Sequence, residues 1–397
     1  MRVIFVNRFY WPDEPATAQL LTDLAEALAA RGDDVTVIAS HPGRPEVPRT
    51  EIRRGVCIIR VRGLRGTSAG LVGKAAEFAT FLGGAVWRLL WVARRGDVIV
   101  AMTDPPLLAI GAWLVAGVRR TRLVHWIQDI YPELAIELSG QRWLRALIPL
   151  RNLVWRRADA CVTLGCDMAV VLAAAGVAPG KIYLVANWAP AGLVVQPVSA
   201  GDTLRTEWDL DGKFIIAYSG NLGRVHDLEP VLSLATALRD EAGIAFVFIG
   251  GGAQRAPLAA EVARRGLANV HFHPSQPRSR LAETLALGDV HLVTLLPGCE
   301  RYVFPSKLYG IAAVGRPVIL IAPPSCGLAQ LVSEHGLGLI FDRTTTAAIA
   351  AAIRILAASP AQCARFGAAS VQFADASGGL ETATASWLRL LDDVKAC

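Results

Sequence analysis

The sequence lacks the features that mark several protein classes. Its seven cysteines are odd in number and form no CxxC pair, which argues against a disulfide framework or a zinc site and favours a reduced cytoplasm. The chain opens with MRVIFVN, which predicts a strand rather than a signal peptide. Its longest apolar stretch, 78–93, is interrupted by Arg88, whereas a spanning helix needs about 20 apolar residues. We therefore expect neither a disulfide-rich secreted protein nor a transmembrane one.

Two fingerprints of nucleotide binding are also missing. Asn-Arg-Phe-Tyr-Trp-Pro follows the first expected strand where GxGxxG would stand, and no Walker A loop occurs. This pattern disfavours NAD and FAD. The only Asp-x-Asp considered, Asp209 to Asp211, lies in an expected linker. We therefore expect neither a cofactor nor a metal.

The composition is that of a folded multidomain protein with an uneven charge. The 397 residues are 53% hydrophobic and 19% charged, enough for two or three domains with real cores. Residues 1–190 hold 23 basic and 16 acidic side chains, a net +7, whereas residues 191–397 carry a net −1. Only five of the forty basic residues are lysine, which a GC-rich genome explains. The basic surplus of the first half needs its own explanation.

Short apolar runs alternate with helical patterns from end to end, and the series restarts near Phe214 after a Pro-, Gly- and Ala-rich segment, 187–211. Continuous apolar strands alternating with helices predict parallel sheets covered on both faces. We expect an α/β protein with two doubly wound, Rossmann-like domains facing each other across a cleft, residues 1–190 and 191–376, and a C-terminal helix in 377–397 that packs back on the first domain. The expected strands are 3–6, 35–39, 57–61, 98–102, 123–127, 160–163, 182–185, 214–218, 245–249, 270–272, 290–295, 318–321 and 339–341.

Two segments of the second half point to phosphate binding. Gly220 and Gly223 follow an expected strand and precede a helix, where backbone N–H groups and Arg224 supply positive potential. Lys307 falls in the first turn of a helix that Pro305 and Ser306 can start. The helix dipole at this N-terminal end favours anions over cations, so a lysine at this position is explained if an anion binds next to it. An ordinary turn and a solvated lysine remain the alternatives.

Together with other segments, these resemble family 4 retaining glycosyltransferases of the GT-B fold, in the branch that assembles bacterial surface polysaccharides, such as fucosaminyltransferase-like O-antigen enzymes. The resemblance covers nearly the whole chain. Its marks are FYWP at 9–12 with AQLLTDL at 18–24, TDPP at 103–106, QDIYPE at 128–133, YSGNLGR at 218–224, FIGGG at 248–252, PSKLYG at 305–310 and GRP at 315–317.

The resemblance implies that the second domain holds a nucleotide-diphosphate sugar, with Arg224 and Lys307 as catalytic cations that grip the pyrophosphate. The donor site it implies comprises Gly220, Asn221, Leu222, Gly223, Arg224, Gly250, Gly251, Glu300, Ser306, Lys307 and Leu308. Two glutamates that many members carry would fall on Tyr302 and Gly310, and Glu300 is displaced by two positions. A basic pair of many members would fall near Asn221 and His226.

The resemblance places the acceptor in the first domain. Asp129 follows an expected strand and is the candidate to orient or deprotonate the acceptor hydroxyl, while a helix N-cap is the alternative role. The other acceptor candidates are Asp13, Glu14, Asp104 and Glu133. His125 alternates within an apolar strand and is expected in the core.

Tryptophan and arginine side chains flank apolar helical stripes in 78–95 and 141–157. Such stretches suit the face of an anionic bilayer, although a helix packed on its own sheet with a solvated basic rim is the alternative. No recognised motif supports nucleic acid as a partner.

These observations predict a metal-independent, retaining hexosyltransferase, with a nucleotide-diphosphate sugar as donor and a polyprenyl-diphosphate-linked saccharide as acceptor. The transferred sugar could be an N-acetylated deoxyhexose, and the enzyme is expected in the cytoplasm, peripheral on the inner face of the plasma membrane. The alternatives are a non-hydrolysing nucleotide-sugar epimerase and a non-catalytic protein that binds sugar nucleotides or a membrane surface.

Overall fold

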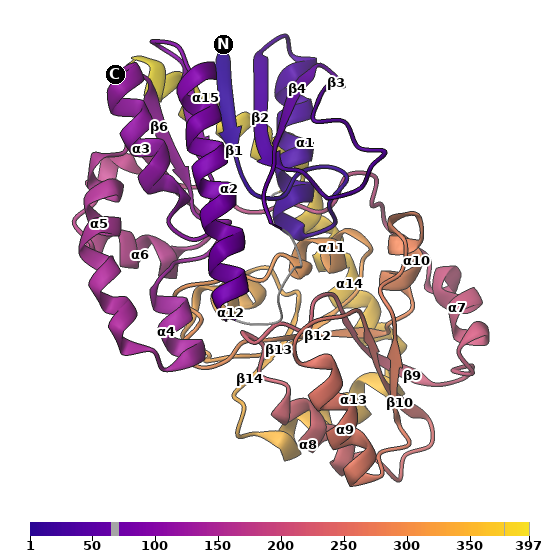
Figure 1. Cartoon of the computed structure of the whole chain (residues 1–397). Coiled ribbons are helices and arrows are strands. Elements are labelled where there is room, and N and C mark those ends of the chain that lie inside the picture. Colours follow the sequence, from indigo (N-terminus) through magenta and orange to yellow (C-terminus); the bar gives the residue numbers. More distant parts are fainter. Residues whose placement is uncertain (65–70, 377, 397) are drawn as a thin grey trace. The chain divides into compact units, whose positions relative to one another are not determined.

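A computed structural model describes residues 1–64, 71–376 and 378–396 of the chain (Figure 1). The chain forms two compact units, one of Met1–Asn187 with Leu380–Cys397 and one of Trp188–Gly379. Each unit is an α/β domain built on a mainly parallel sheet, so the expected α/β class with two Rossmann-like domains is confirmed.

The sheet of the first unit has eight strands in the order β3-β4-β2-β1-β5-β6-β7-β8. All pairs are parallel except β3 with β4. The central strands are buried along their length because helices pack on both faces of the sheet. The strands are β1 (Arg2–Val6), β2 (Asp34–Ser40), β3 (Thr50–Arg53), β4 (Val56–Val61), β5 (Val98–Ala101), β6 (Arg122–Trp126), β7 (Ala160–Thr163) and β8 (Ile182–Leu184).

The helices of this unit mostly connect successive parallel strands. The first one begins after Pro15 and ends before Gly32. They are α1 (Ala16–Ala30), α2 (Leu71–Val92), α3 (Leu108–Arg119), α4 (Glu133–Ser139), η1 (Arg142–Leu147), α5 (Ile148–Arg157), α6 (Cys166–Ala174), η2 (Pro179–Lys181) and α15 (Leu380–Ala396).

The second unit has a fully parallel six-stranded sheet in the order β11-β10-β9-β12-β13-β14. Its strands are β9 (Phe214–Ser219), β10 (Ile244–Ile249), β11 (Val270–His273), β12 (Val290–Thr294), β13 (Val318–Ile321) and β14 (Gly338–Phe341). Its helices are η3 (Val198–Gly201), α7 (Asp202–Glu207), α8 (Glu229–Ala237), α9 (Arg255–Arg265), η4 (Arg278–Arg280), α10 (Leu281–Ala286), α11 (Lys307–Ala313), α12 (Gly327–Glu334), α13 (Thr346–Ala358) and α14 (Pro360–Ala376).

The sequence predicts every described strand within two residues at either end, apart from β3. This strand reads Thr-Glu-Ile-Arg, and its one apolar side chain, Ile52, is 78% exposed. An antiparallel edge strand with no buried face carries no apolar run, so hydrophobic pattern could not reveal it.

The last helix, α15, packs against helix α1 of the first unit. Its apolar face buries Trp387, whose ring meets that of Trp126 edge to face with centroids 4.7 Å apart. Trp126 closes strand β6, so the C-terminal helix contributes directly to the core around that strand. Residues 377 and 397, the two ends of the expected C-terminal segment, lie outside the described residues.

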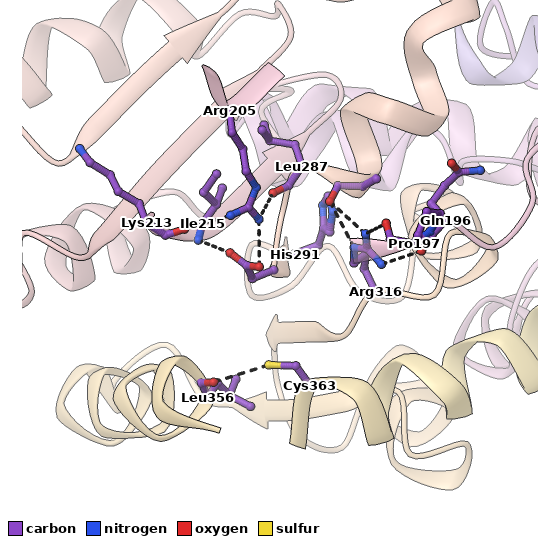
Figure 2. Close-up of polar contacts among 12 residues, drawn as sticks. Gln196, Pro197, Arg205, Lys213, Ile215, Leu287, His291, Arg316, Leu356 and Cys363 are labelled. Atoms are coloured by element: carbon purple, nitrogen blue, oxygen red, sulfur yellow. Dashed lines mark hydrogen bonds and ion pairs between the residues drawn. The ribbon is translucent and has the colours of Figure 1, made fainter. Parts of the chain in front are cut away.

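Arg316, in the Gly-Arg-Pro segment 315–317, joins parts of the second unit that are far apart in sequence (Figure 2). Its buried guanidinium donates to the carbonyls of Gln196, Pro197 and Ala286 at 2.9–3.3 Å. It also reaches the carbonyl of Val314, just after α11. The planar fork of arginine satisfies several carbonyls that would otherwise be buried unpaired, so Arg316 fixes the end of α11 to the segment entering the unit.

The structure adds three observations on groups that the sequence analysis considered. The six described cysteines are free. Within the described ranges, no group of three or more His, Cys, Asp or Glu side chains could hold a metal ion. No single helix in the described part is long and apolar enough to cross a membrane, and α13 with the segment from Pro360 to Ala396 meets that test only together, across a 98° bend.

The packing of α15 predicts that Trp387→Ala destabilises the first unit. Truncating a buried tryptophan leaves a cavity, and we expect the free energy of unfolding to fall by ~3–5 kcal/mol in chemical denaturation followed by circular dichroism. Trp143→Ala is the matched control, because Trp143 is 66% exposed, and its change should stay within about 0.5 kcal/mol. Equal effects of the two variants would contradict the packing described here.

Candidate functional site

The candidate donor site lies at the carboxyl ends of β9 and β12, neighbouring strands of the second unit. The chain leaves β9 toward β10 on one side and leaves β12 toward β13 on the other. Ligands of doubly wound sheets bind where the connections diverge in this way. Gly220 follows β9 directly, and Lys307 begins α11 after the loop that follows β12. The two segments singled out in the sequence therefore meet at one edge of the sheet.

Glycines allow two loops to pack backbone against backbone here. A Cβ added at Gly250 would lie 2.2 Å from the carbonyl oxygen of Gly220, and one at Gly252 would lie 2.6 Å from that of Leu222. The backbone N–H of Leu222 donates to the carbonyl of Gly251 at 2.7 Å. Gln254 ties the other end of the loop by donating its side-chain amide to the carbonyls of Gly223 and His226. These contacts fix the loop 220–226 against the segment 250–254.

Lys307 carries the charge of the site. Its Nζ lies 3.5 Å from the centroid of the Tyr218 ring, and a Cβ at Gly220 would be 4.0 Å from the same atom. The Nζ is buried and has no hydrogen-bond partner among the described residues. Removal from water lowers the pKa of this ammonium group well below its ordinary value. A buried ammonium group without a partner lowers the stability of the fold unless an anion binds next to it.

Further donors lie on the loop that begins at Gly220. The Arg224 side chain is exposed on this loop, and no hydrogen bond or ion pair links it to any described residue. The backbone N–H groups of Asn221 and Gly223 likewise have no partner within the described ranges. Arg224 and the free backbone amides of the Gly220 loop, with Lys307 from the start of α11, are groups suited to phosphate oxygens.

His226, which stands near the position of a family cation, does not supply a positive charge. Burial, with a smaller effect of the nearby Lys307 charge, lowers its pKa to about 3. Its Nδ1 lies 2.7 Å from the carbonyl oxygen of Thr294, so a neutral imidazole donates this hydrogen bond. The ammonium of Lys307, at the start of α11, therefore supplies the buried positive charge next to this loop.

The structure divides the other predicted donor residues by what they can offer. The side chains of Leu222 and Leu308 are fully buried, and the backbone N–H of Leu222 is already used, so Leu222 can support a ligand only indirectly. Ser306 immediately precedes α11 and its hydroxyl caps no backbone group of that helix. Glu300 accepts a hydrogen bond from the backbone N–H of Gly298 at 2.6 Å and so fixes its own turn.

Gly310, where many family members carry a glutamate, is enclosed by apolar groups. A Cβ added there would lie 3.4 Å from a methyl of Leu285 and 3.6 Å from one of Leu193. Both distances are ordinary van der Waals contacts, so apolar side chains line the position at which the resemblance would place a glutamate.

A second cluster lies at the carboxyl ends of β1 and β5 in the first unit, again where the connections diverge. Arg8 follows β1 and pairs with Asp104, which follows β5, at 2.9 Å and with Glu77 at 3.1 Å. Asp129 follows β6, the next strand, and its burial, helped by the nearby Asp104 charge, raises the pKa of Asp129 to about 7. A carboxylate that changes charge near neutral pH is suited to proton transfer or to hydrogen bonding with a hydroxyl.

Asp129 also lines a cavity of about 20 Å³ within the first unit, together with His125, Tyr131 and Arg151. This is room for about one water molecule. His125 is buried, as expected of a core residue, and burial lowers its pKa to about 3. The histidine is therefore neutral and adds no charge beside Asp129.

The structure gives Glu133 a partner of its own. Both of its carboxylate oxygens accept from the buried guanidinium of Arg151, which also stacks 3.6 Å from the Trp155 ring centroid. Asp13 and Glu14 lie in the loop before α1, partly and fully exposed respectively. Acceptor contacts by these three residues stay predictions.

Sequence reasoning missed Arg8, Tyr218 and Arg151. The sequence contains many arginines, and nothing in it separates Arg8 and Arg151 from the others. Only their contacts with carboxylates in the structure do so. Tyr218 stood within a quoted segment but was not assigned a role, because nothing in the sequence shows that its ring faces Lys307.

Two family models match the chain. Residues 17–188 match the glycosyl transferase 4-like domain, and residues 202–373 match the domain of glycosyl transferases group 1. The second match includes both the loop at Gly220 and Lys307.

The chain is similar to proteins of several bacteria. It is 28% identical over 376 residues to WcaI of Escherichia coli K12, named as a colanic acid biosynthesis glycosyl transferase, covering 89% of this chain and 91% of the relative. It is 29% identical over 276 residues to WbjE of Pseudomonas aeruginosa, named as a glycosyltransferase, covering 67% of each.

Among solved structures, the Anabaena protein Alr3699/HepE in complex with UDP-glucose superposes with a TM-score of 0.75, covering 99% of both chains at 16% identity. This likeness shows the fold. The chain is therefore a glycosyltransferase of the GT-B fold, with a glycosyl transferase 4-like domain followed by a domain of glycosyl transferases group 1.

Proposed function

We propose that this protein transfers a hexosyl group, such as an N-acetylated deoxyhexose, from a nucleotide-diphosphate sugar to a polyprenyl-diphosphate-linked saccharide in cell-envelope polysaccharide synthesis. The observation that carries the donor half is the buried, unpaired Nζ of Lys307 beside Gly220. The UDP-glucose complex of a structural neighbour and the name of WcaI support the donor class and the polysaccharide setting. The reaction would take place in the cytoplasm, at the inner face of the plasma membrane.

In this proposal the second unit stabilises the leaving group. The bond between the anomeric carbon and the terminal phosphate oxygen breaks, and negative charge grows on the departing diphosphate. The buried Lys307 and the free amides of the Gly220 loop are held in place before the reaction, so they stabilise that charge with little reorganisation, and the exposed Arg224 adds a second cation. The proposed reaction uses no metal ion, because these groups supply the positive charge.

Residues of the first unit would hold the acceptor. Its hydroxyl oxygen attacks the anomeric carbon from the face that the diphosphate leaves, so the configuration is retained, and the hydroxyl proton passes to the departing phosphate oxygen. In the bound acceptor, before the attack, ionised Asp129 accepts a hydrogen bond from that hydroxyl and orients it, and the hydrogen moves from the carboxylate to the phosphate oxygen as the bond to the phosphate breaks. Asp104 supports this role because its charge contributes to the raised pKa of Asp129.

One alternative has a specific observation in its favour. Gly310 replaces a family glutamate and is enclosed by apolar groups, which would fit a protein that binds sugar nucleotides without transferring the sugar. A non-hydrolysing epimerase, the other alternative, would convert the donor without any acceptor.

The donor class is tested by a thermal-shift screen with UDP-, GDP- and TDP-sugars, followed by turnover assays. A bound donor at 100 times its Kd should raise the free energy of unfolding by about 2.7 kcal/mol. We expect release of the nucleoside diphosphate only when a polyprenyl-diphosphate saccharide is added. Conversion of the donor alone would identify an epimerase, and binding without turnover across a panel of lipid-linked acceptors would identify a binding protein.

Lys307→Met separates function from stability. Losing a preorganised cation should lower kcat by roughly a hundred- to a thousandfold. The ligand-free variant should be at least as stable as the parent, because methionine removes a buried charge that has no partner. Both quantities come from steady-state turnover and chemical denaturation.

Lys395→Met, on the exposed side of α15, is the control that removes one lysine elsewhere. It should leave turnover and nucleotide binding unchanged. Near-normal turnover of Lys307→Met, with donor binding retained, would rule out the role assigned to this lysine.

The raised pKa of Asp129 predicts an acid limb in the pH profile of kcat/KM. Below about pH 7 the carboxyl group of Asp129 is protonated and becomes a weaker, uncharged acceptor for the hydroxyl, so kcat/KM should fall. Asp104→Asn removes a neighbouring charge and should move this limb to lower pH. An unmoved limb in Asp104→Asn would show that another group controls it.

Asp129→Asn should lower turnover while raising stability above about pH 7. A carboxyl group whose pKa is higher in the folded state than in the unfolded chain loses its contribution to stability as the pH rises from the ordinary pKa of 3.8 to about 7. Asparagine does not titrate, so the stability of the variant should not fall in this way. Thermal unfolding at about pH 4 and pH 8 would measure the difference.

A further inference from the structure

The outer face of helices α2, α3, η1 and α5 carries apolar side chains that the fold does not use. On α2, Trp87 and Trp91 are 63% and 66% exposed, with ring centroids 5.8 Å apart in an edge-to-face arrangement. On α3, Leu114 and Val118 are exposed one turn apart. Trp143 on η1 and Leu150 on α5 are exposed as well. We call these six residues the outer apolar set.

The four elements lie next to one another in the first unit (Figure 1). Helix α2 packs directly on α3, where a Cβ added at Gly111 would come within 2.4 Å of a methyl of Val86. Helix α3 in turn packs on α5, and α5 continues from η1. The exposed stripes of neighbouring helices therefore belong to one surface region.

These helices already have a separate apolar face toward the core. Phe81, Ala85 and Leu89 of α2 are buried, as are Leu108 and Val115 of α3. An amphipathic helix packed on its own sheet needs one such face, with polar side chains opposite it. The outer apolar set is a second apolar face on the solvent side, which packing on the sheet does not explain.

The charges of this surface have one sign. Every charged side chain described as exposed on α2, α3, η1, α5 and the turns that follow α2 and α3 is an arginine: Arg88, Arg94, Arg95, Arg119, Arg120, Arg142, Arg145, Arg156 and Arg157.

The carboxylates of the same stretches point elsewhere. Glu77 is paired with Arg8, and Asp97 is buried with Arg2. The nearest exposed carboxylate in sequence, Glu137, lies on α4 ahead of η1. The surface is thus both apolar and strongly cationic.

We infer that this surface docks the first unit on an anionic lipid bilayer. Tryptophan rings settle at the boundary between headgroups and acyl chains, and arginines pair with lipid phosphates, so the two kinds of side chain are complementary to the same partner. An acidic protein surface would match the charges but offers no reason for three exposed tryptophans. This inference deepens the proposed function, since a polyprenyl-linked acceptor is held in a membrane.

The test is co-sedimentation of the full-length protein with vesicles, without any nucleotide sugar. We expect binding to vesicles of equal parts phosphatidylcholine and phosphatidylglycerol, weakening as salt is raised, and little binding to phosphatidylcholine alone. Because each arginine near an anionic surface contributes about a fivefold factor, the triple variant Arg94→Gln, Arg95→Gln, Arg119→Gln should bind on the order of a hundredfold more weakly. The double variant Trp87→Gln, Trp91→Gln should lose roughly tenfold.

Matched controls separate this surface from net charge and general hydrophobicity. Arg239→Gln, Arg365→Gln, Arg389→Gln removes the same charge from exposed positions elsewhere, and Val170→Gln, Ile355→Gln removes two exposed apolar side chains elsewhere. Both controls should bind anionic vesicles as the parent does. Equal loss in variants and controls, equal binding to both vesicle types, or no vesicle binding at all would overturn the inference.

The outcome is independent of the donor site. Lys307→Met should sediment with anionic vesicles like the parent, and the arginine and tryptophan variants should keep full turnover on a water-soluble acceptor analogue. Vesicle binding without turnover would contradict the proposed function alone. Turnover without vesicle binding would contradict the docking surface alone.

Discussion

The ammonium group of Lys307 is held away from water and has no hydrogen-bond partner in the described part of the chain, and the packing of the second unit around it keeps it there. Helix α11, which Lys307 begins, is otherwise buried from Leu308 to Ala313, so the helix cannot turn the lysine outward without exposing apolar surface. Arg316 fixes the region just after the helix to the carbonyls of Gln196 and Pro197. Apolar packing therefore opposes the tendency of a charged group to return to solvent, and the face of the Tyr218 ring offers it only partial compensation. A site of this kind is destabilising until a negatively charged group arrives.

The first unit handles its buried charges in the opposite way. Arg8 meets Asp104 and Glu77, and Arg151 meets Glu133, so each buried guanidinium has a carboxylate in contact. Such pairs position side chains but leave little potential to attract an anion. Asp129 at this edge can gain or lose a proton near neutral pH, because burial and the Asp104 charge raise its pKa to about 7. The sheet edge of the second unit thus offers an unpaired cation, which can stabilise a leaving group. The sheet edge of the first unit offers a titratable carboxylate, which can orient a hydroxyl.

The strands could be predicted because parallel strands that are buried on both faces consist of continuous runs of apolar residues. Strand β3 could not, because Ile52 points into solvent and its neighbours are polar. In the site, spacing singled out Gly220, Arg224 and Lys307, since glycines and a cation at a strand–helix junction have a physical meaning in sequence. That Lys307 lies on the Tyr218 ring depends on the loop between Thr294 and Ser306, whose path no local pattern encodes. The same holds for Arg151, which only tertiary contact with Glu133 separates from the other arginines around it.

The charge imbalance between the halves of the sequence is explained by where the cations lie rather than by the donor site. The half with the surplus of seven positive charges is the one whose sheet-edge arginines are neutralised by carboxylates. Nine of its exposed arginines lie on α2, α3, η1, α5 and the turns that follow α2 and α3, the same elements that carry three exposed tryptophans. The balanced half, by contrast, contains the unpaired Lys307. The long-range electrostatic field and the local binding site are therefore separate properties of this chain. The field depends on many solvated charges on one surface, whereas the binding site depends on a single ammonium group that packing shields from water.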